Sequence, residues 1–249
     1  MLKLERQEQI LNILQTKRYS TVNELSKLLY TSSSSIRRTL IDMENLNLVK
    51  RSYGGVEICE NNTFVIPHNL RINKDAEQKK IIARKAAALV SDGDVIFLDH
   101  SSTCTHLAFE IAQRKSLTVI TNNIDIIMYL KDFSVDIICS GGKICTHDVD
   151  ALTGKYAERV FENTHADFAF FSSHAISQNG TIYDCVYETA NVRAKMLENA
   201  RRKVYLCTEN KINTFSAYKQ CTLADIDYLI CNSEKANVFK DKFAGLTVL

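Results

Sequence analysis

The sequence predicts an α/β protein in which a small winged helix-turn-helix domain precedes a larger domain built around a mainly parallel sheet. Two observations predict this fold. Residues 20–55 hold two short helices with start signals and then a basic hairpin, and apolar strand-like runs alternate with helical stretches after residue 75. A polar stretch with the only proline separates the two parts. The predicted domains are residues 1–58 and 75–249, joined by a linker at 59–74.

The first two helices are predicted from apolar spacing and from one capping motif. A helix over residues 4–16 would bury Ile10, Leu11, Ile13 and Leu14, and residues 17–19 form the bend after it. Thr21-x-x-Glu24 is a capping box that starts the second helix. That helix is expected to turn four side chains inward: Val22, Leu25, Leu28 and Leu29.

The third helix is the candidate recognition helix. Ser32 is a good N-cap, and the inward face is expected to hold Ile36, Leu40, Met43 and Leu46. This arrangement turns four polar residues outward near the start of the helix: Ser33, Ser34, Arg37 and Arg38. Such a position is where a recognition helix meets base edges, and arginine can donate two hydrogen bonds to guanine O6 and N7.

Residues 48–58 alternate around a glycine turn and predict a two-stranded wing. Lys50 and Arg51 would lie along the phosphate backbone, with Tyr53 and Gly54 at the tip. The alternative is a small helical domain whose basic residues are merely solvated. The caps, helix spacing and wing together favour a DNA-binding domain.

Charge supports this division. Residues 1–55 carry nine Lys or Arg and five Asp or Glu, a net of 9 − 5 = +4, and the remainder carries 22 − 24 = −2. A positive field confined to one end suits an anionic partner such as double-stranded DNA. No apolar run approaches the roughly 20 residues of a membrane span, and the charged first helix is unlike a secretion signal. We therefore expect a cytoplasmic protein with no membrane partner.

Eight cysteines occur without a C-x-x-C pair, so we expect reduced, mostly buried thiols. Cys104-x-His106 and Cys145-x-His147 do not have the spacing of a zinc site. The prediction is that the protein holds no metal and no cofactor.

The second domain is expected to alternate strands and helices around a sheet covered on both faces. The predicted strands are 95–98, 117–121, 135–139, 167–171, 204–207 and 228–231. The predicted helices are 75–90, 105–113, 124–130, 155–162 and 188–200.

Small polar residues follow several of these strands, where an open parallel sheet binds its ligands. The predicted ligand-binding residues are Asp99, Ser101, Ser102, Thr103, Asn122, Gly141, Gly142, Lys143 and Lys211. Hydroxyls and amides at a helix start suit a phosphate, and the two lysines add positive charge. Each loop also fits an ordinary turn: Asp99 would orient sugar hydroxyls or cap the next helix, and Lys211 would reach a ligand or lie on the surface. Together they favour a small phosphorylated metabolite.

Catalysis has weaker support. Asp148, Asp150 and Glu158 can be nominated as acid or base only by position, and solvated carboxylates are the simpler interpretation. We therefore predict that the protein is not an enzyme.

The chain resembles the DeoR family of bacterial sugar-metabolism regulators over nearly its whole length. The N-terminal motifs are Arg6-x-x-x-Ile10, Val22-x-Glu24-Leu25, Ser32-x-x-Ser35-Ile36-Arg37-Arg38-x-Leu40 and Arg51-x-x-Gly54-Gly55. The C-terminal motifs are Arg71, Glu77-x-Lys79, Ile82-Ala83, Asp92-Gly93-Asp94-x-Ile96-x-Leu98-Asp99, Thr121-Asn122-Asn123, Gly141-Gly142 and Asn210-Lys211. Two departures stand out: Thr39 replaces the usual aspartate, and Ser101 replaces the glycine of the loop at 99–103.

The resemblance implies an oligomeric repressor whose second domain looks like ribose-phosphate isomerase and senses a sugar phosphate. We expect a regulator of a carbohydrate-utilisation operon that a phosphorylated sugar releases from its DNA operator. One alternative is a sugar-phosphate isomerase that carries a DNA-binding arm. Another is a regulator controlled by a partner protein and not by a small molecule.

Overall fold

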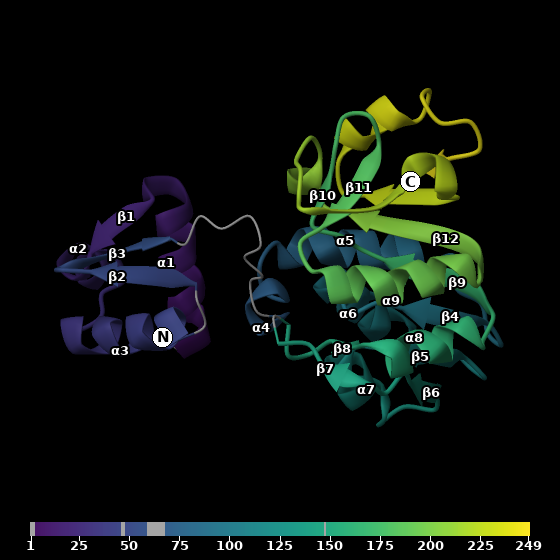
Figure 1. Cartoon of the computed structure of the whole chain (residues 1–249), viewed down its shortest axis with the longest axis horizontal. Coiled ribbons are helices and arrows are strands. Elements are labelled where there is room, and N and C mark those ends of the chain that lie inside the picture. Colours follow the sequence, from purple (N-terminus) through teal and green to yellow (C-terminus); the bar gives the residue numbers. More distant parts are fainter. Residues whose placement is uncertain (1–2, 46–47, 59–67, 147) are drawn as a thin grey trace. The chain divides into compact units, whose positions relative to one another are not determined.

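A computed structural model of the chain describes residues 3–45, 48–58, 68–146 and 148–249. The chain divides into two compact units, Met1–Ile66 and Pro67–Leu249 (Figure 1). The predicted linker at 59–74 spans this division. Its first part lies outside the described residues, and helix α4 (His68–Arg71) belongs to the second unit.

The first unit packs three helices against a small antiparallel sheet. Its elements are α1 (Lys3–Lys17), β1 (Tyr19–Thr21), α2 (Val22–Leu28), α3 (Ser33–Asn45), β2 (Val49–Ser52) and β3 (Gly55–Ile58), with strand order β1-β3-β2. Its core contains Ile10, Leu11, Leu14, Leu25, Ile36, Leu40, Met43, Leu48, Val49 and Val56. This is the predicted winged helix-turn-helix.

The predicted helix starts are confirmed. The Glu24 amide donates to Thr21 Oγ1 at 3.2 Å, and the Thr21 amide donates to Glu24 Oε2 at 2.8 Å. Ser32 accepts the Ser35 amide at 3.3 Å. The inward placement of Leu28 is wrong, since its side chain is 49% exposed at the end of a seven-residue helix. Leu46 lies outside the described residues.

The second unit contains a seven-stranded parallel sheet in the order β15-β14-β12-β9-β4-β5-β6. These strands are β4 (Val95–Leu98), β5 (Thr118–Thr121), β6 (Asp136–Cys139), β9 (Ala166–Phe171), β12 (Ala200–Cys207), β14 (Tyr228–Cys231) and β15 (Thr247–Val248). Its larger helices are α5 (Ala76–Ala87), α6 (Ser102–Ile111), α7 (Ile124–Leu130), α8 (Lys155–Glu162) and α9 (Tyr187–Glu198). Short elements are β7 (Lys143–Ile144), β8 (Leu152–Thr153), β10 (Ala175–Ile176), β11 (Thr181–Asp184), β13 (Tyr218–Thr222), and the 3-10 helices η1 (Glu209–Lys211), η2 (Leu223–Asp225) and η3 (Glu234–Phe239).

Helices cover both faces of this sheet, as predicted. One buried cluster joins the sheet to α5, α6 and α7, and a second joins it to α8, α9 and η3 (Figure 1). The chain order runs outward from the middle of the sheet, through β4, β5 and β6 on one side and β9, β12 and β14 on the other. The carboxyl ends of β4 and β9 therefore mark the point where a doubly wound sheet places a ligand.

The predicted strands and helices are all present, with shifts at their ends. Strand β6 differs in environment, because it is an edge strand with Ile138 41% exposed, not a strand buried on both faces. The antiparallel sheet β10-β11-β13 was not predicted, since its short strands lack a long apolar run.

The cysteine prediction can be checked at seven positions. Five of these thiols are buried, Cys221 is intermediate and Cys139 is exposed, and all seven are free. Within the described ranges, no helix is both long enough and apolar enough to cross a lipid bilayer.

Candidate functional site

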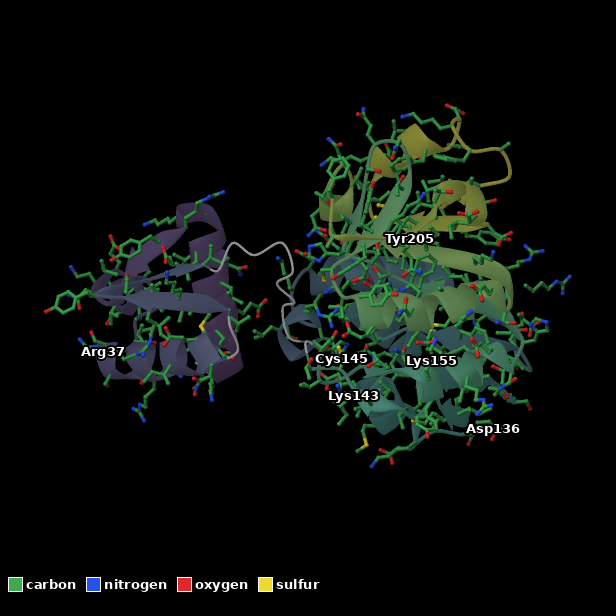
Figure 2. All side chains as sticks on the ribbon, viewed as in Figure 1. Arg37, Asp136, Lys143, Cys145, Lys155 and Tyr205 are labelled. Atoms are coloured by element: carbon green, nitrogen blue, oxygen red, sulfur yellow. The ribbon has the colours of Figure 1, made fainter. Side chains whose placement is uncertain are left out.

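The outer surface of α3 carries the predicted recognition residues. Burial of Ile36 and Leu40 turns Arg37 and Arg38 outward, and both arginines are exposed. Figure 2 shows Arg37 on this helix. Within the described part of the chain, neither guanidinium has a hydrogen-bond or ion-pair partner. Both are therefore available to an external anion or base edge.

The serines before them have different surroundings. Ser34 is exposed, and its hydroxyl lies 3.1 Å from that of the N-cap Ser32, whereas Ser33 is half-buried. All of these residues lie at the amino end of α3, where the first amides of a helix have no partner within the helix. This end is positively polarised and suits a phosphate oxygen.

Thr39 faces α1 and not the exposed surface. The side chain is 2% exposed, its hydroxyl accepts a hydrogen bond from Arg6 Nε at 2.8 Å, and it donates to the Ser35 carbonyl at 3.0 Å. The residue that departs from the family pattern therefore joins α1 to α3 and lies away from Arg37 and Arg38.

The wing is formed by β2 and β3. Gly54 adopts a φ of 85° at its tip beside the fully exposed Tyr53. Lys50 is exposed and lies 3.8 Å from Glu57, whereas Arg51 is paired with Glu44 of α3 at 2.6 Å. Hydrogen bonds from the Arg51 amide and guanidinium lower the pKa of Glu44. Lys50 is therefore more available to an external phosphate than Arg51. Arg51 instead joins the wing to α3 through Glu44.

In the second unit, the loop after β4 is held by internal contacts. Both Asp99 oxygens are engaged: Oδ1 accepts the Ser101 amide at 2.9 Å, and Oδ2 accepts the Ser172 amide at 3.2 Å and Arg193 Nε at 3.0 Å. Ser101 caps α6 by accepting the Cys104 amide at 3.2 Å, and its φ is −73°. A serine therefore fits this position without the backbone strain that a left-handed residue would have.

The first turn of α6 contains Ser102 and Thr103, which are 5% and 1% exposed. Their amides belong to the part of a helix that has no partner within the helix. They lie beside the β4–β9 junction, because the Ser172 amide after β9 bonds the same Asp99 that begins this loop. The loop is therefore a suitable place for a phosphate.

Three basic side chains, which we call the cation cluster, lie near this junction: Arg71, Lys79 and Lys211. The Lys211 ammonium donates to Ser172 Oγ at 2.6 Å, and Lys79 donates to the carbonyls of Arg71 and Lys74. Burial, then the charges of Lys211 and Arg71, lowers the pKa of Lys79 to about 7. Burial, with a further contribution from Arg71, also lowers the pKa of Lys211. Beyond burial, part of each shift comes from a neighbouring positive charge, and a bound anion would offset that repulsion.

The negative charge of Asp148 partly offsets the positive charge of the cation cluster. Asp148 is 2% exposed and pairs with Arg71, and its Oδ2 lies 3.6 Å from His100 Nε2. Asp148 therefore faces the interior and is not the solvated carboxylate that the sequence suggested. Glu158 is likewise buried and pairs with Lys155 at 2.5 Å.

The remaining predicted ligand residues, Asn122, Gly141, Gly142 and Lys143, belong neither to the α6 loop nor to the cation cluster. Asn122 donates from Nδ2 to the Leu152 carbonyl at 3.0 Å, and its buried Oδ1 has no partner among the described residues. Gly141 and Gly142 follow β6 with φ values of 63° and 108°, and Lys143 is exposed in β7. In the described part of the chain, the hydrogen bonds of these last three residues go to Ser140, Cys139 and Thr153 and not to the cation cluster.

Three residues of this region were not predicted from the sequence: Arg193, Asp184 and Ser172. The Arg193 guanidinium is 2% exposed and lies between the carboxylates of Asp99 and Asp184. The signal for it was a charged residue on the apolar face of the predicted helix 188–200, beside Val192 and Met196. A buried arginine at such a position requires acidic partners.

A second group of titratable side chains lies near Asp148. Ligand atoms of His68, Asp125 and Asp150 are all within 4.8 Å of one another. Burial, then the charges of Asp125 and Asp148, raises the pKa of Asp150 to about 6. The rejected cysteine and histidine pairs behave differently: Cys104 donates to the Phe170 carbonyl, His106 bonds the Ile72 carbonyl, and His147 lies outside the described residues.

Comparison with known proteins identifies both units. The model of the DeoR-like helix-turn-helix domain matches residues 6–62, and that of the DeoR C terminal sensor domain matches residues 74–233. The chain is 32% identical to the HTH-type transcriptional regulator GolR of Listeria innocua, covering 100% of this chain and 98% of the relative. It is 29% identical to the lactose phosphotransferase system repressor of Staphylococcus aureus, with 94% of each chain covered. It is also 29% identical to the HTH-type transcriptional repressor GlcR of Bacillus subtilis, over 97% of this chain and 93% of that protein.

Solved structures are more distant. Ribose 5-phosphate isomerase A from Methanocaldococcus jannaschii aligns with a TM-score of 0.42 and 18% identity over 55% of each chain. The eIF2B delta protein from Chaetomium thermophilum aligns with a TM-score of 0.47 and 16% identity, over 80% of this chain and 63% of that one.

Proposed function

The chain belongs to the DeoR family of transcriptional regulators, and on this premise we propose that it is a repressor whose DNA affinity a phosphorylated sugar controls. The target is an operon for carbohydrate utilisation, in keeping with relatives named as a lactose phosphotransferase system repressor and as the repressor GlcR. The observation that carries the proposal is the combination of unpaired arginines on α3 with the cation cluster, of which Lys79 is buried and Arg71 and Lys211 are half-buried, at the carboxyl edge of the sensor sheet.

On the DNA side, Arg37 and Arg38 read base edges in the major groove. Ser33 and Ser34 bond bases or phosphates at the amino end of the same helix. Lys50 contacts the phosphate backbone from the wing. Arg51 joins this contact when its guanidinium leaves Glu44 and pairs with a phosphate. Tyr53 and Gly54 form the tip of the wing beside the backbone. The partner is double-stranded DNA.

On the effector side, the phosphate binds between the amino end of α6 and the cation cluster. The amides of Ser102 and Thr103 donate to its oxygens, and Lys211 supplies a charge from the opposite side of the β4–β9 junction. Lys211 already bonds Ser172, whose amide shares Asp99 with the α6 loop. The sugar hydroxyls reach Asn122, whose Oδ1 is an unused acceptor. Gly141, Gly142 and Lys143 remain predicted contacts to the far end of the ligand.

Asp99 has another role in this proposal. Its carboxylate fixes the α6 loop, Ser172 and Arg193 relative to one another, so it positions the phosphate site and does not bind sugar hydroxyls. Ser101 acts in the same way, since its side chain is used as a helix cap.

The ligand controls DNA binding only if the DNA-bound and free states bind it differently. We propose that the protein acts as a homo-oligomer, which lets two or more recognition helices engage repeated operator half-sites. Support comes from the edge strand β6 with Ile138 exposed, next to α7 with Met128 exposed. A cytoplasmic location follows from the need to reach chromosomal DNA.

The protein is proposed to lack catalytic activity. Of the three carboxylates nominated from sequence, Asp148 is committed to Arg71 and Glu158 to Lys155. Asp150 remains, and it lies with His68 and Asp125, whose ligand atoms are within 4.8 Å of its own. The isomerase alternative is tested by incubating the full chain with pentose and hexose phosphates and following turnover.

The experiment for the main proposal uses the full chain and a duplex selected from a randomised pool. A panel of pentose and hexose phosphates is screened first by thermal shift, because a ligand that binds only the folded state raises its apparent stability. The stabilising sugar phosphate should then release the duplex, whereas the unphosphorylated sugar should not. A DNA complex that every sugar phosphate leaves intact would instead support control by a partner protein.

A further inference from the structure

Three side chains from separate segments meet beside α4. His68 opens α4, Asp125 lies in the first turn of α7, and Asp150 precedes β8. One ligand atom from each lies within 4.8 Å of the other two. The chemistry of the set, one imidazole nitrogen and two carboxylates, is that of a divalent metal site.

The two carboxylates are held on rigid backbone. The Ile124 amide donates to the Asp150 carbonyl at 2.9 Å, and the Leu152 amide donates to the Asn122 carbonyl at 2.8 Å. The Asp125 amide is capped by Asn123 Oδ1 at 2.8 Å. The start of α7 and the loop before β8 are thus fastened together, which fixes the separation of the two acids.

The hydrogen bonds of Thr105 match one tautomer of the His68 ring. The Thr105 hydroxyl donates to the Ser101 carbonyl at 3.3 Å, and Oγ1 accepts Asn123 Nδ2 at 3.2 Å. The contact between Oγ1 and His68 Nε2 at 3.1 Å completes this set when Nε2 donates. In that tautomer Nδ1 has a lone pair and no hydrogen.

That lone pair faces an acidic oxygen. The His68 side chain is 0% exposed, and Nδ1 lies 2.7 Å from Asp125 Oδ2. Even so, Nδ1 has no hydrogen-bond partner among the described residues. Two electron-rich atoms this close repel each other unless a proton or a metal ion lies between them, and a metal ion that binds here would take the place of the proton. Ligands about 2.1 Å from one ion lie roughly 3.4 Å apart at the tetrahedral angle and roughly 3 Å apart at a right angle, so this contact is nearer to the right angle of octahedral coordination.

We propose that His68 Nδ1, Asp125 and Asp150 bind one divalent transition-metal ion, of which Mn²⁺ and Zn²⁺ are the best matches. The imidazole ligand disfavours Ca²⁺ and Mg²⁺, which prefer sites made of oxygen atoms. The bond from Nε2 to Thr105 orients the ring, as the second nitrogen of a metal-bound histidine commonly does. Three protein ligands leave further positions for water. The spacing of the three residues in the sequence gave no indication of this site.

Mn²⁺ binding to the full-length chain tests the proposal. After EDTA treatment and dialysis, free Mn²⁺ is followed by electron paramagnetic resonance during a titration. The wild type should bind one ion per chain. Asp125→Asn and Asp150→Asn should each weaken Mn²⁺ binding by about 10-fold or more. Loss of a residue that only supports a metal ligand already costs about this much, so loss of a direct ligand should cost at least as much. Asp136→Asn changes an exposed carboxylate on β6 and is the matched control, with affinity within about twofold of wild type.

The variants change partly exposed side chains, so that folding is preserved where replacement of the buried His68 would endanger it. Thermal melts without metal verify this. Thr105→Val should weaken Mn²⁺ by about 10-fold by freeing the ring. Nitrogen-15 spectra of the Zn²⁺-loaded wild type should show His68 protonated on Nε2 and metal-bound at Nδ1. Absence of Mn²⁺ and Zn²⁺ binding, wild-type affinity in both aspartate variants, or a proton on Nδ1 of the Zn²⁺-loaded protein would overturn the proposal.

Discussion

The carboxylate of Asp99 lies 3.0 Å from Nε of Arg193, and both side chains are almost fully buried. The same carboxylate holds the amides of Ser101 and Ser172, at the ends of the two central strands of the sheet. Asp184 pairs with the other side of the guanidinium. The loop proposed to bind phosphate is therefore supported by an ion-pair network beneath it.

Removing Asp99 should destabilise the second unit. Asp99→Ala leaves Arg193 buried beside one remaining carboxylate, and losing one partner of a buried pair typically costs about 3–5 kcal/mol. The free energy of unfolding from urea titration of the second unit measures this. Glu198→Gln breaks only the exposed contact with Lys195 and should change little. A small loss for Asp99→Ala, equal to that of Glu198→Gln, would refute the structural role.

The contact of Arg6 with Thr39 gives a second prediction. Thr39→Val preserves the shape but removes the oxygen that accepts Arg6 Nε, so the first unit should lose about 1 kcal/mol of stability. Thr39→Asp should retain that stability, because its carboxylate can pair with Arg6. Thermal melts of the wild type, Thr39→Val and Thr39→Asp test this prediction. Equal stability of Thr39→Val and the wild type would mean that the hydrogen bond from Arg6 contributes nothing.

The two lysines predicted from sequence should differ in their effect on the response to ligand. Lys211→Met removes a member of the cation cluster. Affinity for the stabilising sugar phosphate should fall by about 10–100-fold, because a hydrogen bond to a charged group contributes about 1.5–3 kcal/mol. Lys143→Met changes an exposed side chain whose ammonium has no hydrogen bond or ion pair to the cation cluster among the described residues, and it should have a smaller effect. Calorimetric titration compares them. The reverse order would place the phosphate near β7.

Lys79 should make sugar-phosphate binding depend on pH. Burial, then the charges of Lys211 and Arg71, lowers the pKa of Lys79 to about 7. Above pH 7 the folded protein therefore loses the positive charge of Lys79, which favours binding of an anion. Affinity should fall between pH 7 and 9, by at most about tenfold per pH unit. The phosphate is already a dianion over this range.

Without ligand, stability should follow the opposite trend. The unfolded chain keeps the Lys79 proton up to its ordinary pKa, near 10.4, so the free energy of unfolding should rise above pH 7. Lys79→Met should remove both pH effects. Urea titrations across this range, alongside calorimetry, provide the measurement, and an unchanged pH profile in Lys79→Met would assign the effects to another group.

Much of the fold follows from local signals in the sequence. Thr21 and Glu24 form the expected capping box because both partners lie within one turn. The strands and helices of the second unit were predictable because a buried sheet needs continuous apolar runs. Leu28 was misplaced because a seven-residue helix is too short for its apolar spacing to define one buried face.

The candidate sites were only partly predictable. The strand-end loops could be located, because topology fixes where a parallel sheet presents them. Their partners could not, since Arg71, Lys79 and Arg193 come from helices whose side-chain contacts depend on tertiary packing. The same limit applies to Asp99, because a carboxylate after a strand gives no sign of a buried arginine 94 residues later in the chain.

The most direct test of the account is DNA binding by the arginines of α3. Fluorescence anisotropy at one fixed salt concentration compares wild type, Arg37→Ala and Arg38→Ala on the selected duplex, with Lys131→Ala as an exposed control in the other unit. Each arginine variant should lose about 1–3 kcal/mol of binding free energy, whereas Lys131→Ala should match wild type. Arginine variants that bind the duplex as tightly as wild type would contradict the assignment of α3 as the recognition helix.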